Sequence, residues 1–175
     1  MVLLGQESTV SVTMEEMLIH CRSVTRGAEY AFVVGDMPFL SYNVSIPEAI
    51  QNAGRFFKEA NVDAIKLEGG VEMANTVRAI TNAGMAVVGH IGFTPQSVAQ
   101  LGGYRIQGKK ADSAVSLYQD ALALQEAGAI AIVLEMVPAK VAEAISNALS
   151  IPTIGIGAGV GCDGQVLVFH DLLGL

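Results

Sequence analysis

Residues 62–91 read VDAIKLEGGVEMANTVRAITNAGMAVVGHI, and this stretch decides the fold. It starts with an apolar run over 62–68, continues through 71–84 with apolar positions at helical spacing, and ends in a second apolar run over 85–91. Strand, helix and strand in this order predict a βαβ unit with parallel strands. Near-continuous apolar runs are typical of parallel strands that are covered on both faces.

The same alternation extends in both directions along the chain. Strands are expected at residues 30–36, 62–68, 85–91, 130–136, 152–158 and 165–171. Helices are expected at residues 12–27, 45–60, 71–84, 113–128 and 139–150. A series of βα units predicts either a (β/α)8 barrel or a doubly wound sheet.

The positions of the ionisable residues favour the barrel. Asp36, Lys66 with Glu68, His90 and Glu135 come at or near the C-terminal ends of four consecutive predicted strands. In a barrel these ends surround one site, whereas in an open sheet they spread along an edge. The sequence therefore predicts that these side chains line one pocket of a TIM barrel.

Composition limits the kind of function. The 175 residues are 51% hydrophobic and 15% charged, so they can bury the core of a single domain over residues 1–175. A net charge of −7 argues against nucleic-acid and anionic-membrane partners and favours small-molecule chemistry. The two cysteines, Cys21 and Cys162, indicate neither a disulfide framework nor a zinc site. Without a leader-like segment or a long apolar span, a cytoplasmic protein is expected.

Asp36 and Glu68 are candidate ligands of Mg²⁺, which commonly takes one or two carboxylates and fills its other positions with water and substrate oxygens. Other readings stay open for both residues. A strand-end Asp often caps a helix or bonds to a loop, and Glu68 could form an ion pair with Lys66, two residues away on the same face of the strand.

Lys66, His90 and Glu135 are candidates for substrate binding and catalysis. Lys66 could bind a substrate carboxylate or form a Schiff base, and the neighbouring carboxylates favour the first role. His90 could bond to the substrate, move a proton or be an ordinary core histidine. Glu135 follows four apolar residues, and such an environment suits a general base.

Seven motifs follow one another in the order found in one known enzyme family. They are DMPFLSY (36–42), IKLEGG (65–70), GHIGFTPQS (89–97), GGYRIQGK (102–109), LEMVP (134–138), IPTIGIGAG (151–159) and DGQVLVFHDLLGL (163–175). Along essentially its whole length the chain resembles the ketopantoate hydroxymethyltransferases, the 3-methyl-2-oxobutanoate hydroxymethyltransferase family of pantothenate and coenzyme A biosynthesis.

The resemblance implies a (β/α)8 barrel that uses Mg²⁺ and transfers a hydroxymethyl group from 5,10-methylenetetrahydrofolate to 3-methyl-2-oxobutanoate through an enolate. It implies Asp36 and Glu68 as metal ligands, Asp36, Lys66 and His90 as substrate-binding residues, and Glu135 as the catalytic base. It identifies no folate-binding residue. It also implies a large homo-oligomer, a decamer in the family.

The chain departs from the family pattern at both ends. Family members carry two earlier strands, with a further metal-binding Asp and a substrate-binding Ser, and a C-terminal helical tail. The chain is therefore expected to cover about six βα units of a barrel domain incomplete at both ends, since such barrels need about 250 residues. The absent strands could be disordered, deleted or supplied by a partner.

Two alternative functions remain at this stage. An inert truncated homologue would keep only oligomer contacts. A Mg²⁺-dependent carbon–carbon lyase of the phosphoenolpyruvate mutase and isocitrate lyase group would handle a similar 2-oxo acid. Those lyases typically carry a reactive cysteine in a loop where this chain has GGYRIQGKK (102–110), which argues against that reading.

Overall fold

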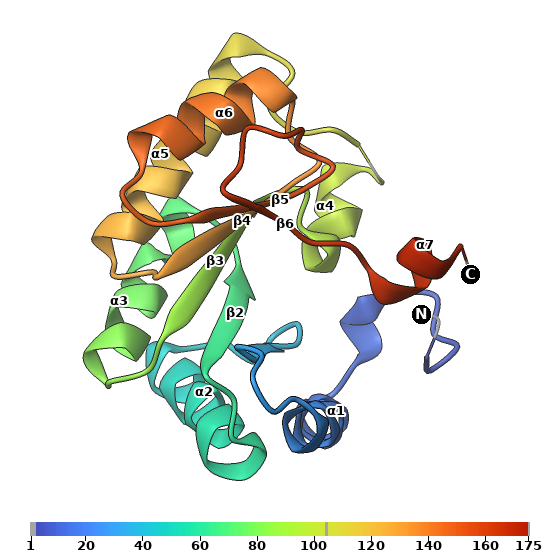
Figure 1. Ribbon diagram of the computed structural model, residues 1–175. Coiled ribbons are helices and arrows are strands. Elements are labelled where there is room, and N and C mark those ends of the chain that lie inside the picture. Colours follow the sequence, from blue (N-terminus) through green and yellow to red (C-terminus); the bar gives the residue numbers. More distant parts are fainter. Residues whose placement is uncertain (1–2, 104, 175) are drawn as a thin grey trace.

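The computed structural model describes residues 3–103 and 105–174, and it contains a sheet of six parallel strands in chain order. The strands are β1 (Val34–Asp36), β2 (Ala64–Glu68), β3 (Val87–Gly92), β4 (Ala131–Glu135), β5 (Thr153–Ile156) and β6 (Gly164–Gln165). A doubly wound sheet reverses its strand order at a switch point, and here each strand pairs with the next one in sequence. The sheet curls into an α/β half-barrel (Figure 1).

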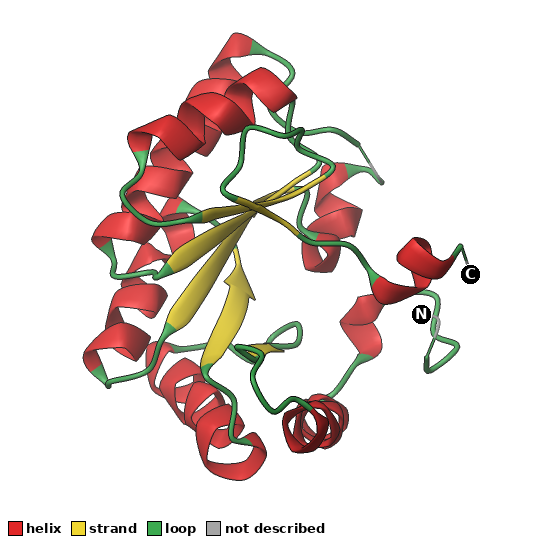
Figure 2. Ribbon diagram, in the orientation of Figure 1, coloured by secondary structure: helices red, strands yellow, loops and turns green. Residues whose placement is uncertain are grey.

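The first of the main helices precedes β1, and the other four connect consecutive strands. They are α1 (Met14–Gly27), α2 (Ile46–Ala60), α3 (Ala74–Asn82), α5 (Ala111–Glu126) and α6 (Ala139–Ala148). Short elements complete the chain: η1 (Thr9–Ser11), η2 (Val71–Met73), η3 (Pro95–Ser97), α4 (Val98–Leu101) and α7 (Phe169–Leu173). Helices α2, α3, α5 and α6 cover the convex face of the curl, while η1 and α7 lie on its open side (Figure 2).

Local sequence explains where the first two long helices begin. Thr13 caps α1 in a capping box, because its hydroxyl accepts from the backbone N–H of Glu16 and the Glu16 carboxylate accepts from the backbone N–H of Thr13. Ser45 caps α2, and Pro47 stands in the first turn, where no backbone donor is needed. No helix among the described residues is both long and apolar enough to cross a membrane.

The core lies between the convex face of the sheet and the helices. Ile65 and Leu67 of β2 and Ile132 of β4 are fully buried and belong to one apolar cluster with Phe56 of α2 and Leu124 of α5. Side chains alternate between faces along a strand, so Lys66 and Glu68 of the same β2 point to the concave side. The apolar core thus fixes which face carries the ionisable residues.

The two outermost predicted strands are shorter than expected. Residues 30–33 lie outside β1. Of the predicted strand over 165–171, only Gln165 belongs to β6, and residues 169–171 belong to α7 instead. Both segments belong to the edges of the sheet, where a strand has a hydrogen-bonding neighbour on one side only. Because an edge strand forms backbone hydrogen bonds with one neighbour and not two, apolar composition alone does not keep these segments extended.

Candidate active site

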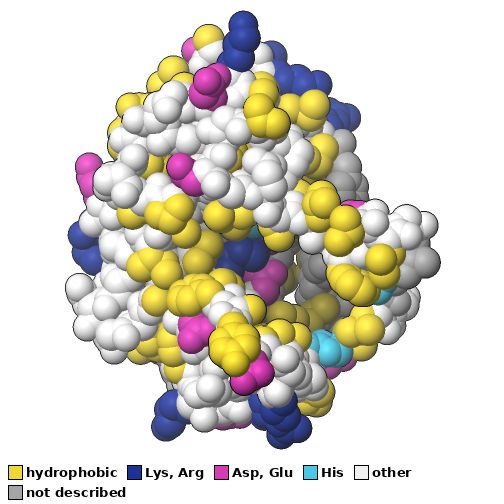
Figure 3. Space-filling view, viewed as in Figure 1, with side chains coloured by type: hydrophobic (Ala, Val, Ile, Leu, Met, Phe, Trp, Pro, Cys, Tyr) yellow, Lys and Arg dark blue, Asp and Glu magenta, His cyan; other side chains and the backbone are white. Residues whose placement is uncertain are grey.

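A pocket of about 560 Å³ lies on the concave face of the half-barrel. Its ionisable lining residues come from four neighbouring strands: Asp36 of β1, Lys66 and Glu68 of β2, His90 of β3 and Glu135 of β4. In the space-filling view, charged atoms lie in a hollow bordered by hydrophobic side chains (Figure 3). The structure thus brings all five predicted site residues into one pocket.

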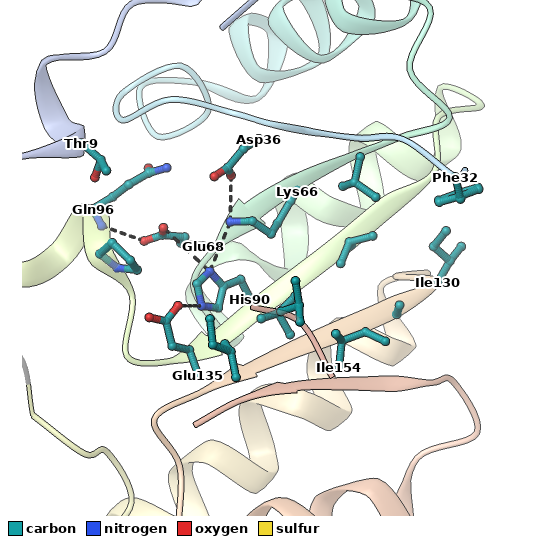
Figure 4. A pocket seen from close by; sticks show the side chains of 17 residues that line it. Thr9, Phe32, Asp36, Lys66, Glu68, His90, Gln96, Ile130, Glu135 and Ile154 are labelled. Atoms are coloured by element: carbon teal, nitrogen blue, oxygen red, sulfur yellow. Dashed lines mark hydrogen bonds and ion pairs between the residues drawn. The ribbon is translucent and has the colours of Figure 1, made fainter. Parts of the chain in front are cut away.

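The remaining pocket wall is largely apolar and lies deeper along the same strands. Val88 and Val133 precede the ionisable positions on β3 and β4 and line the same pocket. Ile154 of β5 also lines it (Figure 4). The pocket is therefore amphipathic, with a charged end at the carboxyl ends of the strands and an apolar end below it. Such a shape suits a small ligand with a polar head and a branched hydrocarbon tail.

Lys66 lies between a carboxylate and an imidazole. Its Nζ is 2.8 Å from Asp36 Oδ1 and 3.3 Å from His90 Nδ1. Lys66 therefore forms its ion pair with Asp36 across adjacent strands, and not with Glu68 as one reading of the sequence allowed. The buried Asp36 Oδ1 has this charged neighbour but no well-aligned hydrogen bond among the described residues.

Glu68 is the most deeply buried of the carboxylates in this pocket. Its Oε2 accepts a hydrogen bond from the backbone N–H of Gln96 at 3.0 Å, while Oε1 is 3.8 Å from His90 Nδ1. Burial raises the pKa of Glu68 to about 7; the positive charge of Lys66 opposes the shift, and repulsion from Asp36 and Glu135 adds to it. A nearby cation would favour the ionised form.

His90 is 2% exposed, and its two ring nitrogens face different partners. Because the Lys66 ammonium is only a donor, His90 Nδ1 acts as the acceptor, which assigns the ring proton to Nε2. Nε2 is 3.2 Å from Glu135 Oε2, near enough for electrostatic attraction but not aligned as a hydrogen bond. Burial and the positive charge of Lys66 lower the pKa of His90, so the neutral ring is favoured.

The shifted pKa of Glu68 predicts a pH dependence of stability in metal-free protein. The folded state binds the Glu68 proton more tightly than the unfolded state, whose pKa is near 4.5. The resulting stabilisation is complete below pH 4.5 and is lost as pH rises to about 7, a change of about 3 kcal/mol. Glu68→Gln, which stays neutral, should remove this pH dependence.

The measurement is the free energy of unfolding at pH 4.5 and 7.5, for both proteins and without divalent ions. His90, whose pKa is lowered, contributes in the opposite direction, because its unfolded form gains a proton below about pH 6.5. His90 is present in both proteins, so their difference reports the Glu68 carboxyl together with its effect on the ring 3.8 Å away. Parallel pH profiles would contradict a raised Glu68 pKa.

Sequence reasoning assigned no role to Gln96 and Tyr42, two neighbours of Glu68. Tyr42 Oη accepts from the backbone N–H of Glu68 at 3.2 Å and donates to Gln96 Oε1 at 2.7 Å. Both residues stand in loops that follow the carboxyl ends of strands, where the active sites of barrels are built. This position is the feature of the sequence that could have pointed to them. Neither residue type is diagnostic by itself.

Asp36 and Glu68 together suit a hard divalent cation. Asp36 Oδ1 is buried with the Lys66 ammonium 2.8 Å away but without an aligned hydrogen bond, and Glu68 Oε1 is outside hydrogen-bonding distance of His90. The described residues contain no group of three His, Cys, Asp or Glu side chains placed to hold a metal. Two carboxylates are nevertheless a common protein contribution to a Mg²⁺ site, with water and substrate completing the coordination.

Comparison with protein families gives a match over residues 1–175 to the model described as ketopantoate hydroxymethyltransferase. The chain is 57% identical, over its whole length, to a 3-methyl-2-oxobutanoate hydroxymethyltransferase of Nitratidesulfovibrio vulgaris (strain DP4), and covers 57% of that protein. It is 59% identical to the enzyme of that name from Heliobacterium modesticaldum and covers 63% of it. The chain thus spans about three fifths of these relatives.

Solved structures share the fold at low sequence identity. A proposed phosphonomutase from Burkholderia cenocepacia J2315 matches with a TM-score of 0.64 and 14% identity, over 82% of this chain and 62% of the other. A proposed lyase or mutase from the same organism matches with a TM-score of 0.59 and 15% identity, over 94% and 59%. At this identity the likeness concerns the backbone architecture only.

Proposed function

The chain belongs to the ketopantoate hydroxymethyltransferase family, and from that premise we propose that it forms the catalytic part of a 3-methyl-2-oxobutanoate hydroxymethyltransferase. The reaction would convert 3-methyl-2-oxobutanoate to 2-dehydropantoate for pantothenate biosynthesis, with 5,10-methylenetetrahydrofolate as one-carbon donor. One observation carries the proposal. Five ionisable side chains from four adjacent strands meet in a single pocket whose other walls are mostly apolar.

The pocket matches the proposed 2-oxo acid in chemistry. The Lys66 ammonium, now beside Asp36, would bind the substrate carboxylate as a point charge. The isopropyl tail would lie against Val88, Val133 and Ile154, which line the apolar end. In this orientation C3, the methine carbon of the isopropyl group, would lie next to the polar head, at the end of the pocket that His90 and Glu135 line.

Asp36 and Glu68 would hold Mg²⁺. When bound, the ion would act as a Lewis acid toward the 2-oxo acid and make the hydrogen on C3 more acidic. Its charge would also favour the ionised form of Glu68, whose pKa is raised to about 7 without it.

Glu135 would act as the general base. Its carboxylate would take the proton from C3, and the electron pair left on C3 would form the new carbon–carbon bond to the one-carbon unit. Net uptake of one water would supply the hydroxyl oxygen as tetrahydrofolate leaves. His90, whose Nε2 is 3.2 Å from Glu135 Oε2, would help to orient the base through electrostatic attraction.

Proton exchange tests this mechanism without the folate. Incubation with 3-methyl-2-oxobutanoate and Mg²⁺ in D₂O should replace the hydrogen on C3 by deuterium, and NMR follows the loss of its signal. A chelator should stop the exchange, and added Mg²⁺ should restore it. An inert homologue would give no exchange under either condition. Exchange that persists in excess chelator would contradict the proposed role of the metal.

The lyase alternative has less support. Relatives named 3-methyl-2-oxobutanoate hydroxymethyltransferase are 55–59% identical to the chain, whereas the proposed phosphonomutase and the proposed lyase or mutase share 14–15% identity and only their backbone architecture. The proposal further includes a complete (β/α)8 barrel and a large homo-oligomer for the whole protein. Sedimentation analysis of the purified protein would measure the oligomer directly.

A further inference from the structure

A buried glutamine bonds to the Glu68 carboxylate and to the residue that follows Asp36. Gln96 belongs to η3, in the loop after β3, and is 9% exposed. Burying an amide is costly unless its donors and acceptor are paired. The carbonyl oxygen and the NH₂ group of Gln96 are each paired with a residue of the loop that follows β1.

Gln96 bonds to three different residues. Its backbone N–H donates to Glu68 Oε2 at 3.0 Å, its Nε2 donates to the Met37 carbonyl at 2.8 Å, and its Oε1 accepts from the Tyr42 hydroxyl at 2.7 Å. The amide orientation follows from chemistry, since a carbonyl can only accept and therefore faces the NH₂ group. Tyr42 adds a second connection by accepting from the backbone N–H of Glu68.

These bonds connect the backbones that carry the two carboxylates. Met37 directly follows Asp36, and its own N–H donates to the Lys66 carbonyl at 3.0 Å. Gln96 therefore joins the end of β1 to the Glu68 carboxylate at the end of β2. The network also distinguishes the two carboxylate oxygens of Glu68. Oε2 accepts the hydrogen bond from the Gln96 backbone N–H, and Oε1 does not.

We propose that Gln96, oriented by Tyr42, is a positioning residue that sets the separation of the Asp36 and Glu68 carboxylates and so determines the affinity of the site for a divalent cation. The inference rests on the proposed metal site but concerns residues outside its ligands. Partners of ligating groups generally orient the ligand, and their loss costs about 10-fold to 100-fold in metal affinity. Gln96 would act on both carboxylates at once.

Two variants test the role of the amide. Gln96→Met keeps the size and the backbone N–H but removes both side-chain hydrogen bonds, and Tyr42→Phe keeps the ring but removes the hydroxyl. Binding of Mn²⁺ alone is measured by the EPR signal of the free ion. We expect the dissociation constant to rise about 10-fold to 100-fold for Gln96→Met and about 10-fold for Tyr42→Phe. The double variant should lose less than the product of the two factors, because both changes remove the same Tyr42–Gln96 hydrogen bond.

Matched controls separate positioning from general stability. Tyr118→Phe changes a partly buried tyrosine of α5 that is not among the residues lining the active-site pocket. Gln107→Met removes an amide whose Nε2 donates to the nearby Arg105 carbonyl, away from that pocket. Both should bind Mn²⁺ as the unaltered protein does. A lower melting temperature with an unchanged Mn²⁺ dissociation constant in Gln96→Met and Tyr42→Phe would overturn the inference. Failure of the unaltered protein to bind Mn²⁺ would instead overturn the proposed metal site.

Discussion

Glu135→Gln is expected to slow deuterium exchange at C3 of 3-methyl-2-oxobutanoate by about 10²-fold to 10⁴-fold, the usual contribution of a positioned general base. The amide keeps the size of the side chain but cannot accept the C3 proton at neutral pH. The structural basis is the position of Glu135 at the end of β4, in the pocket and 3.2 Å from His90 Nε2. NMR of the substrate in D₂O with saturating Mg²⁺ measures the rate.

A matched control and a binding measurement complete this test. Glu126→Gln makes the same chemical change at an exposed position at the end of α5 and should leave the exchange rate unaltered. Mn²⁺ affinity should change little in Glu135→Gln, because Glu135 is not a proposed ligand. Exchange at the rate of the unaltered protein would exclude Glu135 as the base. Loss of Mn²⁺ binding together with exchange would indicate that Glu135 belongs to the metal site.

Gly92→Ala is expected to destabilise the fold by about 3–4 kcal/mol and to abolish proton exchange. Gly92 ends β3 with a φ of +94°, and a Cβ there would collide with the backbone oxygen of Glu135. That oxygen accepts from the Phe93 N–H at 2.7 Å, so relief of the collision would move the strand end that carries the base. The expected cost combines about 1–2 kcal/mol for the positive φ with about 1–3 kcal/mol for overpacking.

Gly84→Ala is the appropriate comparison. Gly84 has a φ of +90°, almost the same as Gly92, but an added Cβ would meet no atom within 4 Å. Its cost should therefore be limited to about 1–2 kcal/mol, a decrease of a few degrees in melting temperature, against about 10 °C for Gly92→Ala. Equal effects of the two substitutions would show that backbone conformation alone matters at Gly92, and not its contact with Glu135.

The interior of the half-barrel was the part of the fold best predicted from sequence. β2, β3 and β4 lie within the predicted ranges or one residue beyond them, because each is paired on both sides and buried against helices. The edge segments 30–36 and 165–171 were overestimated. Their Val, Phe and Leu content is that of a strand, but the length of an edge strand depends on a neighbour that the local sequence does not specify.

The site was partly predictable for a similar reason. Residue type and position at strand ends selected Asp36, Lys66, Glu68, His90 and Glu135, and the structure places all five in one pocket. Their metal, substrate and base roles stay predictions. The pairing of Lys66 with Asp36 was not predictable, because it depends on the register Asp36↔Lys66 between neighbouring strands.

The sequence by itself determined the α/β alternation, the parallel strands and the set of ionisable residues at their ends, since these follow from local periodicity and residue chemistry. Only the tertiary structure decided which groups touch. The contacts among Lys66, His90 and Glu135, the raised pKa of Glu68, and the bonds of Gln96 all depend on curvature and burial. These contacts join residues that are tens of residues apart in the chain, and a local sequence pattern does not specify the distance between such residues.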